Sequence, residues 1–172
     1  MLKIAGLFGM VAALGLLGML KSSELKLRVA LLQDFLQMIL ALKSKIDYLH
    51  EPLQSVLKDE RGGAERKALQ LLTGVQRDLE TRQADTLQRA WDENVRSTYR
   101  GTPLSERDLE LLRYPGMFLG QTDCENQAQQ FAYLVTCLQA QIREAEGQYR
   151  SKGPLYRKVG FFGGTLLAVV LL

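Results

Sequence analysis

The stretch TDCENQAQQFAYLVTCLQAQIREAEGQYR, residues 122–150, contains the strongest helical pattern in the sequence. Its apolar positions alternate spacings of four and three, as on one face of an amphipathic helix. They are Cys124, Ala128, Phe131, Val135, Leu138, Ile142, Ala145 and Tyr149. Thr122 and Glu125 have the spacing of a capping box, which marks a helix start. We therefore expect a helix of about 28 residues that ends near Arg150 and is kinked at Gly153-Pro154.

A second long helix is predicted over residues 25–49. Its apolar residues also step by threes and fours. They are Leu25, Val29, Leu32, Leu36, Ile39, Leu42, Ile46 and Leu49. Gln33, Asp34 and Gln37 lie in the middle of this segment. Because such polar residues are costly inside a bilayer, the pattern indicates a helix of a bundle rather than a membrane span.

Shorter helices are predicted between these two. Apolar residues with helical spacing predict one helix at about residues 64–80 and another at 84–98, with turns before and after each. Ser105 with Asp108 three residues later resembles another helix start, and Pro115 should end or kink that helix near Tyr114. Alternation with a period of two is never long enough to indicate a strand, so the predicted fold class is all-α.

The two ends of the chain differ from its middle. The 172 residues are 47% hydrophobic and 24% charged, which is typical of one folded domain. Ile4–Leu20, however, is uncharged and would reach about 26 Å as a helix, near the lower limit for crossing a bilayer. Val159–Leu172 is also uncharged and would reach about 21 Å. We expect membrane anchors at residues 1–20 and 159–172 and a helical domain at residues 21–158.

The first apolar segment fits two interpretations, a removed signal peptide and an uncleaved anchor. Signal peptides and anchors can both begin with a basic residue followed by an apolar run, and here Lys3 precedes the apolar run that starts at Ile4. Cleavage sites require small residues, and Leu20 is bulky at the corresponding position. This favours the anchor.

Basic residues gather where each apolar end meets the middle section. They are Lys21, Lys26, Arg28, Arg150, Lys152, Arg157 and Lys158. The positive-inside rule therefore places the middle section in the cytoplasm, and we expect these residues to contact anionic membrane lipids. Residues 29–149 carry 14 Lys or Arg and 18 Asp or Glu, a net charge of −4. This acidic balance argues against nucleic-acid binding.

The sequence contains no recognisable catalytic, cofactor-binding or metal-binding motif. His50 is the only histidine, and its place beside Pro52 fits a helix junction better than a general base. Zinc spacings, C-x-x-C and the phosphate-binding loop motif are absent from the sequence. Cys124 and Cys137 face in different directions on one straight helix, so they should not form a disulfide. We expect a protein that is not an enzyme and has no cofactor.

Two polar groups are candidate partner contacts. One is the acidic pair in the segment predicted at residues 84–98, and the other is the start of the last long helix, rich in amides. An ordinary solvated surface would have the same composition. The candidate residues are Asp92, Glu93, Gln121, Asp123, Glu125, Asn126, Gln127 and Gln130.

Several stretches together resemble the stage III sporulation protein AB family of endospore-forming bacteria. The matching pieces occur in the same order over essentially the whole chain. They are Tyr48-Leu49-His50-Glu51-Pro52-Leu53, Ala90-Trp91-Asp92-Glu93, Glu110-Leu111-Leu112-Arg113 leading to Leu119-Gly120, Asp123, Glu125 to Gln127, and the tail from Gly160 to Leu172.

The resemblance implies a bundle of about six helices, similar to the cytoplasmic domain of the type II secretion F component and without catalytic activity. It also implies a membrane platform for a hexameric secretion ATPase and other subunits of a channel between mother cell and forespore. The protein would sit in the mother-cell membrane, the outer membrane around the forespore, with its domain in the cytoplasm. A homo-oligomer fits as well. The alternative is a membrane-anchored receptor or sensor stalk whose long helices pair as a coiled coil through Phe131 to Tyr149.

Overall fold

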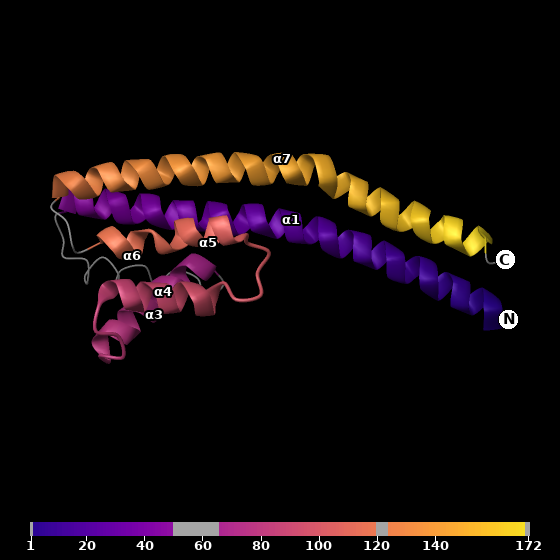
Figure 1. Cartoon of the computed structure of the whole chain (residues 1–172), viewed down its shortest axis with the longest axis horizontal. Coiled ribbons are helices and arrows are strands. Elements are labelled where there is room, and N and C mark those ends of the chain that lie inside the picture. Colours follow the sequence, from indigo (N-terminus) through magenta and orange to yellow (C-terminus); the bar gives the residue numbers. More distant parts are fainter. Residues whose placement is uncertain (1, 50–65, 120–123, 171–172) are drawn as a thin grey trace. The chain divides into compact units, whose positions relative to one another are not determined.

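The structure is a computed structural model that describes residues 2–49, 66–119 and 124–170. Near the ends of the longest helices it describes the backbone but only part of the side chains. The described residues form helices and no strand, so the predicted all-α class is confirmed. Figure 1 shows the helices α1 (Leu2–Leu49), α3 (Lys67–Glu80), α4 (Leu87–Thr98), α5 (Glu106–Arg113), α6 (Pro115–Phe118) and α7 (Cys124–Val170).

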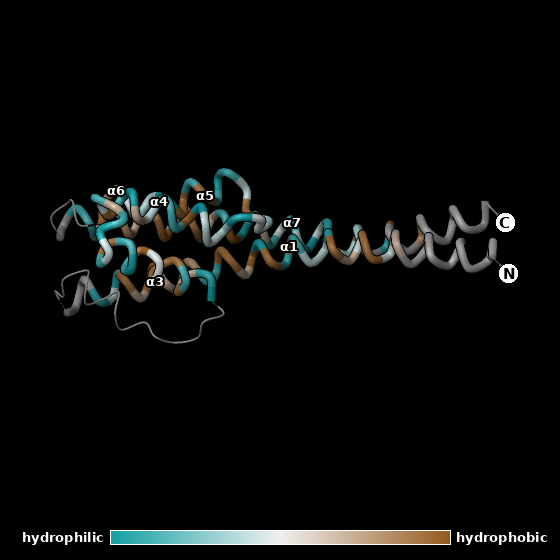
Figure 2. The backbone as a smooth tube through the Cα atoms, turned by 90° about the horizontal axis from the view of Figure 1, so that it is seen from below, coloured by the Kyte–Doolittle hydropathy of each residue, from teal (hydrophilic) through white to brown (hydrophobic). Residues whose placement is uncertain are grey.

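The chain divides into two compact units. The first comprises Met1–Val29 with Arg143–Leu172, and the second comprises Ala30–Ile142. In the first unit, segments of α1 and α7 run side by side, and the start of α1 at Leu2 and the end of α7 at Val170 lie at the same end (Figures 1 and 2). Gly153 of α7 is buried there, and a Cβ at this position would lie 3.4 Å from the hydroxyl oxygen of Ser22 on α1.

Helix α1 continues without a break across the predicted boundary between anchor and domain at residue 20. The segment Met19–Glu24 at this junction contains neither Gly nor Pro, and two of its polar side chains make contacts on the helix itself. The Ser23 hydroxyl donates to the Leu20 carbonyl at 2.8 Å, and Lys21 pairs with Glu24 at 2.8 Å. Such local contacts let one helix join an apolar and a polar stretch.

The predicted end of the last helix near Arg150 is wrong, because α7 continues to Val170 with Pro154 inside it. A proline inside a helix removes one backbone hydrogen bond. At this proline, the neighbouring Gly153 packs closely against Tyr149 and against Ser22 of α1. The prediction of a helix end rested on the local Gly-Pro sequence alone, which does not indicate a contact with another helix.

Among the described residues, we find no helical stretch of the length and apolarity needed to cross a bilayer. The predicted anchors, residues 1–20 and 159–172, fall mostly among residues whose side chains lie outside the described part.

The core of the second unit confirms the central part of both predicted apolar stripes. Leu25 and Val29 are half-buried, and the side chains of Ile46, Leu49 and Cys124 lie outside the described part. Leu32, Phe35 and Ile39 of α1 are fully buried, as are Phe131 and Leu138 of α7. Large side chains from the shorter helices complete this core. They are Leu71, Leu72, Trp91 and Leu112.

Local signals around α5 are confirmed in detail. The Ser105 hydroxyl accepts from the Asp108 N–H at 3.2 Å, and the Asp108 carboxylate accepts from the Ser105 N–H at 2.8 Å, which completes the capping box. Helix α5 ends at Arg113, and Pro115 starts the short helix α6. Thr122, the predicted cap of the last helix, lies outside the described residues, as does the side chain of its predicted partner Glu125.

Candidate interaction surface on helix α4

Helix α4 is a short amphipathic helix with one face in the core. Thr86 caps its start, since the threonine hydroxyl oxygen accepts from the Arg89 N–H at 3.3 Å. Its buried side chains are Ala90, Trp91, Asn94 and Val95. The opposite, exposed face therefore has a fixed position relative to the core.

Trp91 attaches α4 to α5 and α6. Its indole N–H donates to the Leu112 carbonyl oxygen at 2.8 Å, which satisfies a polar group that burial would otherwise leave unpaired. Gly116 of α6 approaches the same side chain so closely that a Cβ there would lie 2.9 Å from the Trp91 Cβ. The Trp91 side chain thus contacts the backbone of α5 at Leu112 and of α6 at Gly116.

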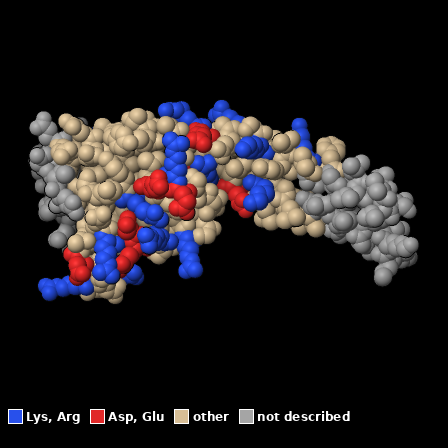
Figure 3. All heavy atoms as spheres, in the orientation of Figure 1, with Lys and Arg blue, Asp and Glu red and all other residues tan. Residues whose placement is uncertain are grey.

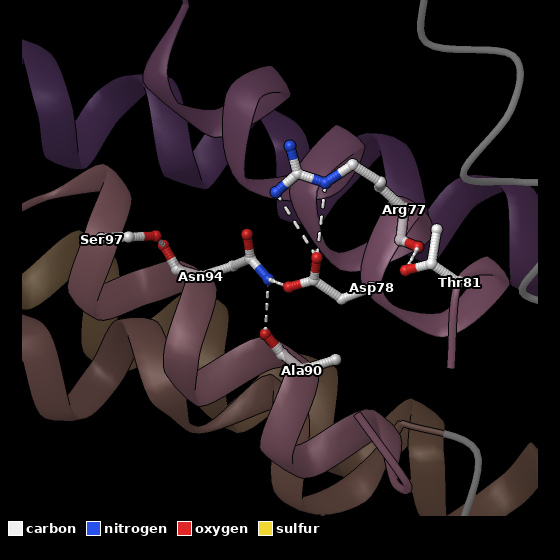
Figure 4. A network of polar contacts seen from close by, with 6 residues as sticks. All are labelled: Arg77, Asp78, Thr81, Ala90, Asn94 and Ser97. Carbon is white, nitrogen blue, oxygen red and sulfur yellow. Dashed lines mark hydrogen bonds and ion pairs between the residues drawn. The ribbon is translucent and has the colours of Figure 1, made fainter. Parts of the chain in front are cut away.

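Asn94 attaches α4 to α3 through a buried polar network (Figure 4). The Asn94 amide donates to the Asp78 carboxylate at 2.6 Å and to the Ala90 carbonyl at 2.8 Å. Arg77 reaches the same carboxylate at 3.4 Å. Buried polar groups are stable only when paired in this way, so the network fixes how α3 and α4 pack.

The exposed side of α4 borders a hollow of about 360 Å³. Its lining residues are Thr86, Gln88, Arg89, Asp92, Glu93 and Arg96. Figure 3 shows positive and negative side chains intermixed in this region. Arg89 pairs with Glu93 at 2.9 Å and lies 3.7 Å from Asp85. The hydrogen bond to Glu93 raises the pKa of the Arg89 guanidinium above its ordinary value.

The structure brings two of the predicted contact residues together here. Asp92 is half-buried and Glu93 is exposed, and both line the hollow. The sequence prediction did not name Arg89 or Arg96. The spacing by four of Asp85, Arg89 and Glu93 was a signal for Arg89, and that of Asp92 and Arg96 was one for Arg96, because such residues face one another on a helix.

The other predicted contact residues lie on or before α7, away from this helix in the sequence. Asn126 is exposed, while Gln127 and Gln130 are half-buried. Gln130 accepts a hydrogen bond from the Tyr114 hydroxyl. Gln121 and Asp123, together with the side chain of Glu125, lie outside the described part. The contact role of this group stays a prediction.

The basic residues near the chain ends have different surroundings. Arg28 is buried in the first unit, where its guanidinium donates to the Gln148 side-chain oxygen at 3.0 Å. Those with exposed side chains are Lys21, Lys26, Arg150, Lys152 and Lys158. The Arg157 side chain lies outside the described part. The exposed set is available to a lipid surface, whereas Arg28 links α1 to α7.

Among the described residues, no group of three or more His, Cys, Asp or Glu side chains is placed to hold a metal ion. Cys137 carries a free thiol. His50 lies outside the described residues. The absence of catalytic and cofactor-binding residues stays a prediction from the sequence.

The coiled-coil alternative requires the apolar stripe from Phe131 to Tyr149 to pair with a second copy, but most of this stripe is buried within the chain itself. Phe131 and Leu138 are fully buried, and Ile142 and Ala145 are 8% and 1% exposed. Helices that pair between copies need such side chains at their surface. A stalk formed through this stripe therefore conflicts with the packing.

Comparison with known proteins gives consistent matches. The family model described as stage III sporulation protein AB matches residues 3–172. A curated relative, stage III sporulation protein AB of Bacillus subtilis (strain 168), is 23% identical over 132 residues, which cover 77% of each chain. A solved structure of a stage III sporulation protein AB is 21% identical, with a TM-score of 0.59, over 72% of this chain and 96% of that one. The solved structure supports the fold.

Proposed function

We infer the function of this chain from its family: it belongs to the stage III sporulation protein AB family, whose model spans residues 3–172. We propose that it is a non-enzymatic membrane platform subunit of a channel similar to type II secretion systems, joining mother cell and forespore. In this role it docks a cytoplasmic hexameric secretion ATPase. It lies in the mother-cell membrane, the outer membrane around the forespore, with its helical domain in the cytoplasm.

Membrane attachment is supported by large apolar side chains that the first unit leaves in solvent. On α1, Leu16, Leu17, Met19 and Leu20 are 58–60% exposed, and on α7 Val159 and Phe162 are 59% and 67% exposed. Large exposed apolar patches mark membrane or protein contacts. Lys21, Lys152 and Lys158 carry positive charge beside these residues, as anionic headgroups require.

ATPase docking is supported by one observation above all, the charged hollow beside α4. Its charges stand on a helix that Trp91 and Asn94 hold to the core through buried hydrogen bonds. A charged rim on a rigid element favours specific docking over nonspecific adhesion. Asp92 and Glu93 are the acidic residues that the hollow offers to a basic surface of the ATPase.

Binding of the cognate ATPase tests this proposal. The full chain in detergent is compared with the double variant Asp92→Arg, Glu93→Arg, and affinity is measured by biolayer interferometry. We expect at least a tenfold loss, because like charges meet across the interface. The matched control Glu106→Arg changes an exposed acidic residue outside the hollow and should bind as the wild type does. Equal binding by both variants would contradict docking at α4.

Location and biological role need separate measurements. Reporter fusions after Gly62 and after Leu172 should give a cytoplasmic signal only at the first site. Deletion of the gene should stall spores after engulfment. A cytoplasmic signal after Leu172 would contradict the two-anchor topology, and normal spores would contradict the role in the channel.

A further inference from the structure

The charged side chains on the exposed side of α4 fall into two sets. In the first set, Arg89 donates to the Glu93 carboxylate at 2.9 Å and lies 3.7 Å from the Asp85 carboxylate. Asp92 and Arg96 form the second set, and both line the same hollow. Within the ranges that the structure describes, neither of them makes a hydrogen bond or an ion pair. We call Asp92 and Arg96 the open charge pair.

The two sets differ in what a partner must disturb to bind them. Glu93 can bind a cation of a partner only by sharing or giving up its hydrogen bond to Arg89. Asp92 and Arg96 are four residues apart, a spacing at which side chains on a helix can pair, yet an exposed ion pair contributes little to stability. Both members of the open charge pair are therefore available to a partner at little cost.

Asp92 is the member whose surroundings favour a bound cation. The residue is half-buried in the hollow, so neighbouring atoms already displace part of the water that would hydrate its carboxylate. An opposite charge placed against such a carboxylate compensates for the lost hydration. Arg96, in contrast, is exposed, and its guanidinium can bind a carboxylate through two parallel hydrogen bonds. The open charge pair therefore suits a partner that brings one base and one acid.

The backbone beneath the open charge pair is held by the core. Trp91, directly before Asp92, is 1% exposed, and Val95, directly before Arg96, is fully buried. Four residues of α-helix rise about 6 Å, so the two backbone positions keep this separation along α4. A partner can satisfy both charges only when its base and its acid have a matching separation and order along the helix. The pair therefore selects a partner by geometry as well as by charge.

We propose that Arg96 and Asp92 together determine which surface docks at the hollow, with Arg96 binding a carboxylate and Asp92 a cationic side chain of the secretion ATPase. The inference rests on the ATPase docking proposed above and adds Arg96 as a specificity-determining residue. Glu93, already bonded to Arg89, contributes less to binding than Asp92 does. A purely basic or purely acidic surface is rejected, because it places one member of the pair against its own sign.

Exchange of the two charges tests the geometric part of the proposal. The double variant Asp92→Arg, Arg96→Asp keeps the net charge of the hollow but reverses the order of the signs along α4. Affinity of the full chain in detergent for the cognate ATPase is measured by biolayer interferometry. We expect a loss of about tenfold or more, because each charge then meets its own sign. Binding equal to that of the wild type would show that only net charge matters and would overturn the proposal.

Single substitutions assign the roles of the individual residues. Arg96→Glu should lower the affinity about tenfold or more, whereas the control Arg107→Glu makes the same change of charge at an exposed site outside the hollow and should bind as the wild type does. Asp92→Asn should lower the affinity about fivefold or more, and Glu93→Gln less than about twofold. Equal effects of Arg96→Glu and Arg107→Glu, or of Asp92→Asn and Glu93→Gln, would overturn the proposal.

The same measurements separate this inference from ATPase docking itself. If the double variant Asp92→Arg, Glu93→Arg loses binding while Arg96→Glu binds as the wild type does, the inference fails and docking at α4 stands. If every variant binds as the wild type does, both fail. A second copy of the chain also carries both signs, so sedimentation of the full chain without ATPase is compared for the wild type and Arg96→Glu. We expect equal sedimentation, and a wild-type dimer that Arg96→Glu dissociates would overturn the assignment to the ATPase.

Discussion

Gly74 on α3 lies directly against Asn94 on α4, where a Cβ added to the glycine would be 2.0 Å from the Asn94 side-chain oxygen. Asn94 is held in place by its hydrogen bonds to Asp78 and Ala90. The missing side chain of Gly74 thus makes room for the polar link between the two helices.

Gly74→Ala should therefore destabilise the protein, although alanine is the better helix former. Its intrinsic helix preference is worth about 1 kcal/mol, while displacing Asn94 strains a close-packed, hydrogen-bonded site. We expect a net loss of about 1–3 kcal/mol in the free energy of unfolding. Urea unfolding followed by the fluorescence of Trp91, the single tryptophan, measures it.

The matched control is Gly147→Ala. Gly147 is also helical, but a Cβ there would meet nothing within 4 Å. Alanine should stabilise this site by about 0.5–1 kcal/mol. Similar effects of the two substitutions would show that contact with Asn94 does not determine the need for Gly74.

The Trp91 indole should contribute through its hydrogen bond as well as its volume. Trp91→Phe removes the donor to the Leu112 carbonyl, in a residue that is fully buried. An acceptor left unpaired in the core costs about 1–3 kcal/mol. Unfolding measured by circular dichroism should show a loss of this size, and unchanged stability would mean that the carbonyl finds another partner.

Asp34 should act as a cap for a helix remote in the sequence. One carboxylate oxygen accepts from the Ala68 N–H in the first turn of α3 at 2.9 Å, and the other accepts from Arg66 at 2.6 Å. Loss of an N-terminal cap costs about 0.5–2 kcal/mol, whereas an exposed ion pair is worth about 0–1 kcal/mol. Asp34→Ala should therefore destabilise more than Arg66→Ala in urea unfolding. Equal losses in the two variants would assign the main effect to the ion pair, because Asp34→Ala removes both interactions and Arg66→Ala only the pair.

Sequence spacing predicted what depends on residues close together in the chain. It identified the buried stripes of α1 and α7, the capping box at Ser105 and Asp108, and the break at Pro115. These features follow from helical periodicity and from backbone chemistry within one or two turns.

Contacts between distant segments escaped the prediction. Asp34 as a cap for α3 and Gly74 against Asn94 each join different helices, and periodicity does not state which helices become neighbours. The same reason explains Pro154, which lies inside α7 beside the buried Gly153. At the α4 surface, Asp92 and Arg96 are four residues apart on one helix, so their proximity was predictable from spacing, whereas the face of α4 that the core leaves exposed required the fold.

Tyr99 should make the free energy of unfolding decrease as the pH rises into the alkaline range. Its side chain is 3% exposed, and its hydroxyl has no hydrogen-bond partner among the described residues. Burial, together with the negative charge of Asp34, raises the pKa of Tyr99 above its ordinary value of 10.0. In the unfolded chain the phenol ionises near pH 10, whereas in the folded chain it keeps its proton. The contribution of this group is therefore fully present below pH 10 and is lost as the pH rises above it.

Tyr99→Phe separates this effect from that of other groups. Near pH 7 the Tyr99 phenol of the wild type is neutral in both the folded and the unfolded state, and removal of an unpaired buried hydroxyl should change the free energy of unfolding little. Above pH 10 the wild type should lose up to about 1.4 kcal/mol per pH unit more than the variant, because one proton fewer is bound on unfolding. Urea unfolding at pH 7, 10 and 11 measures the difference. Parallel pH profiles of the two proteins would mean that the Tyr99 phenol titrates alike in the folded and unfolded chain.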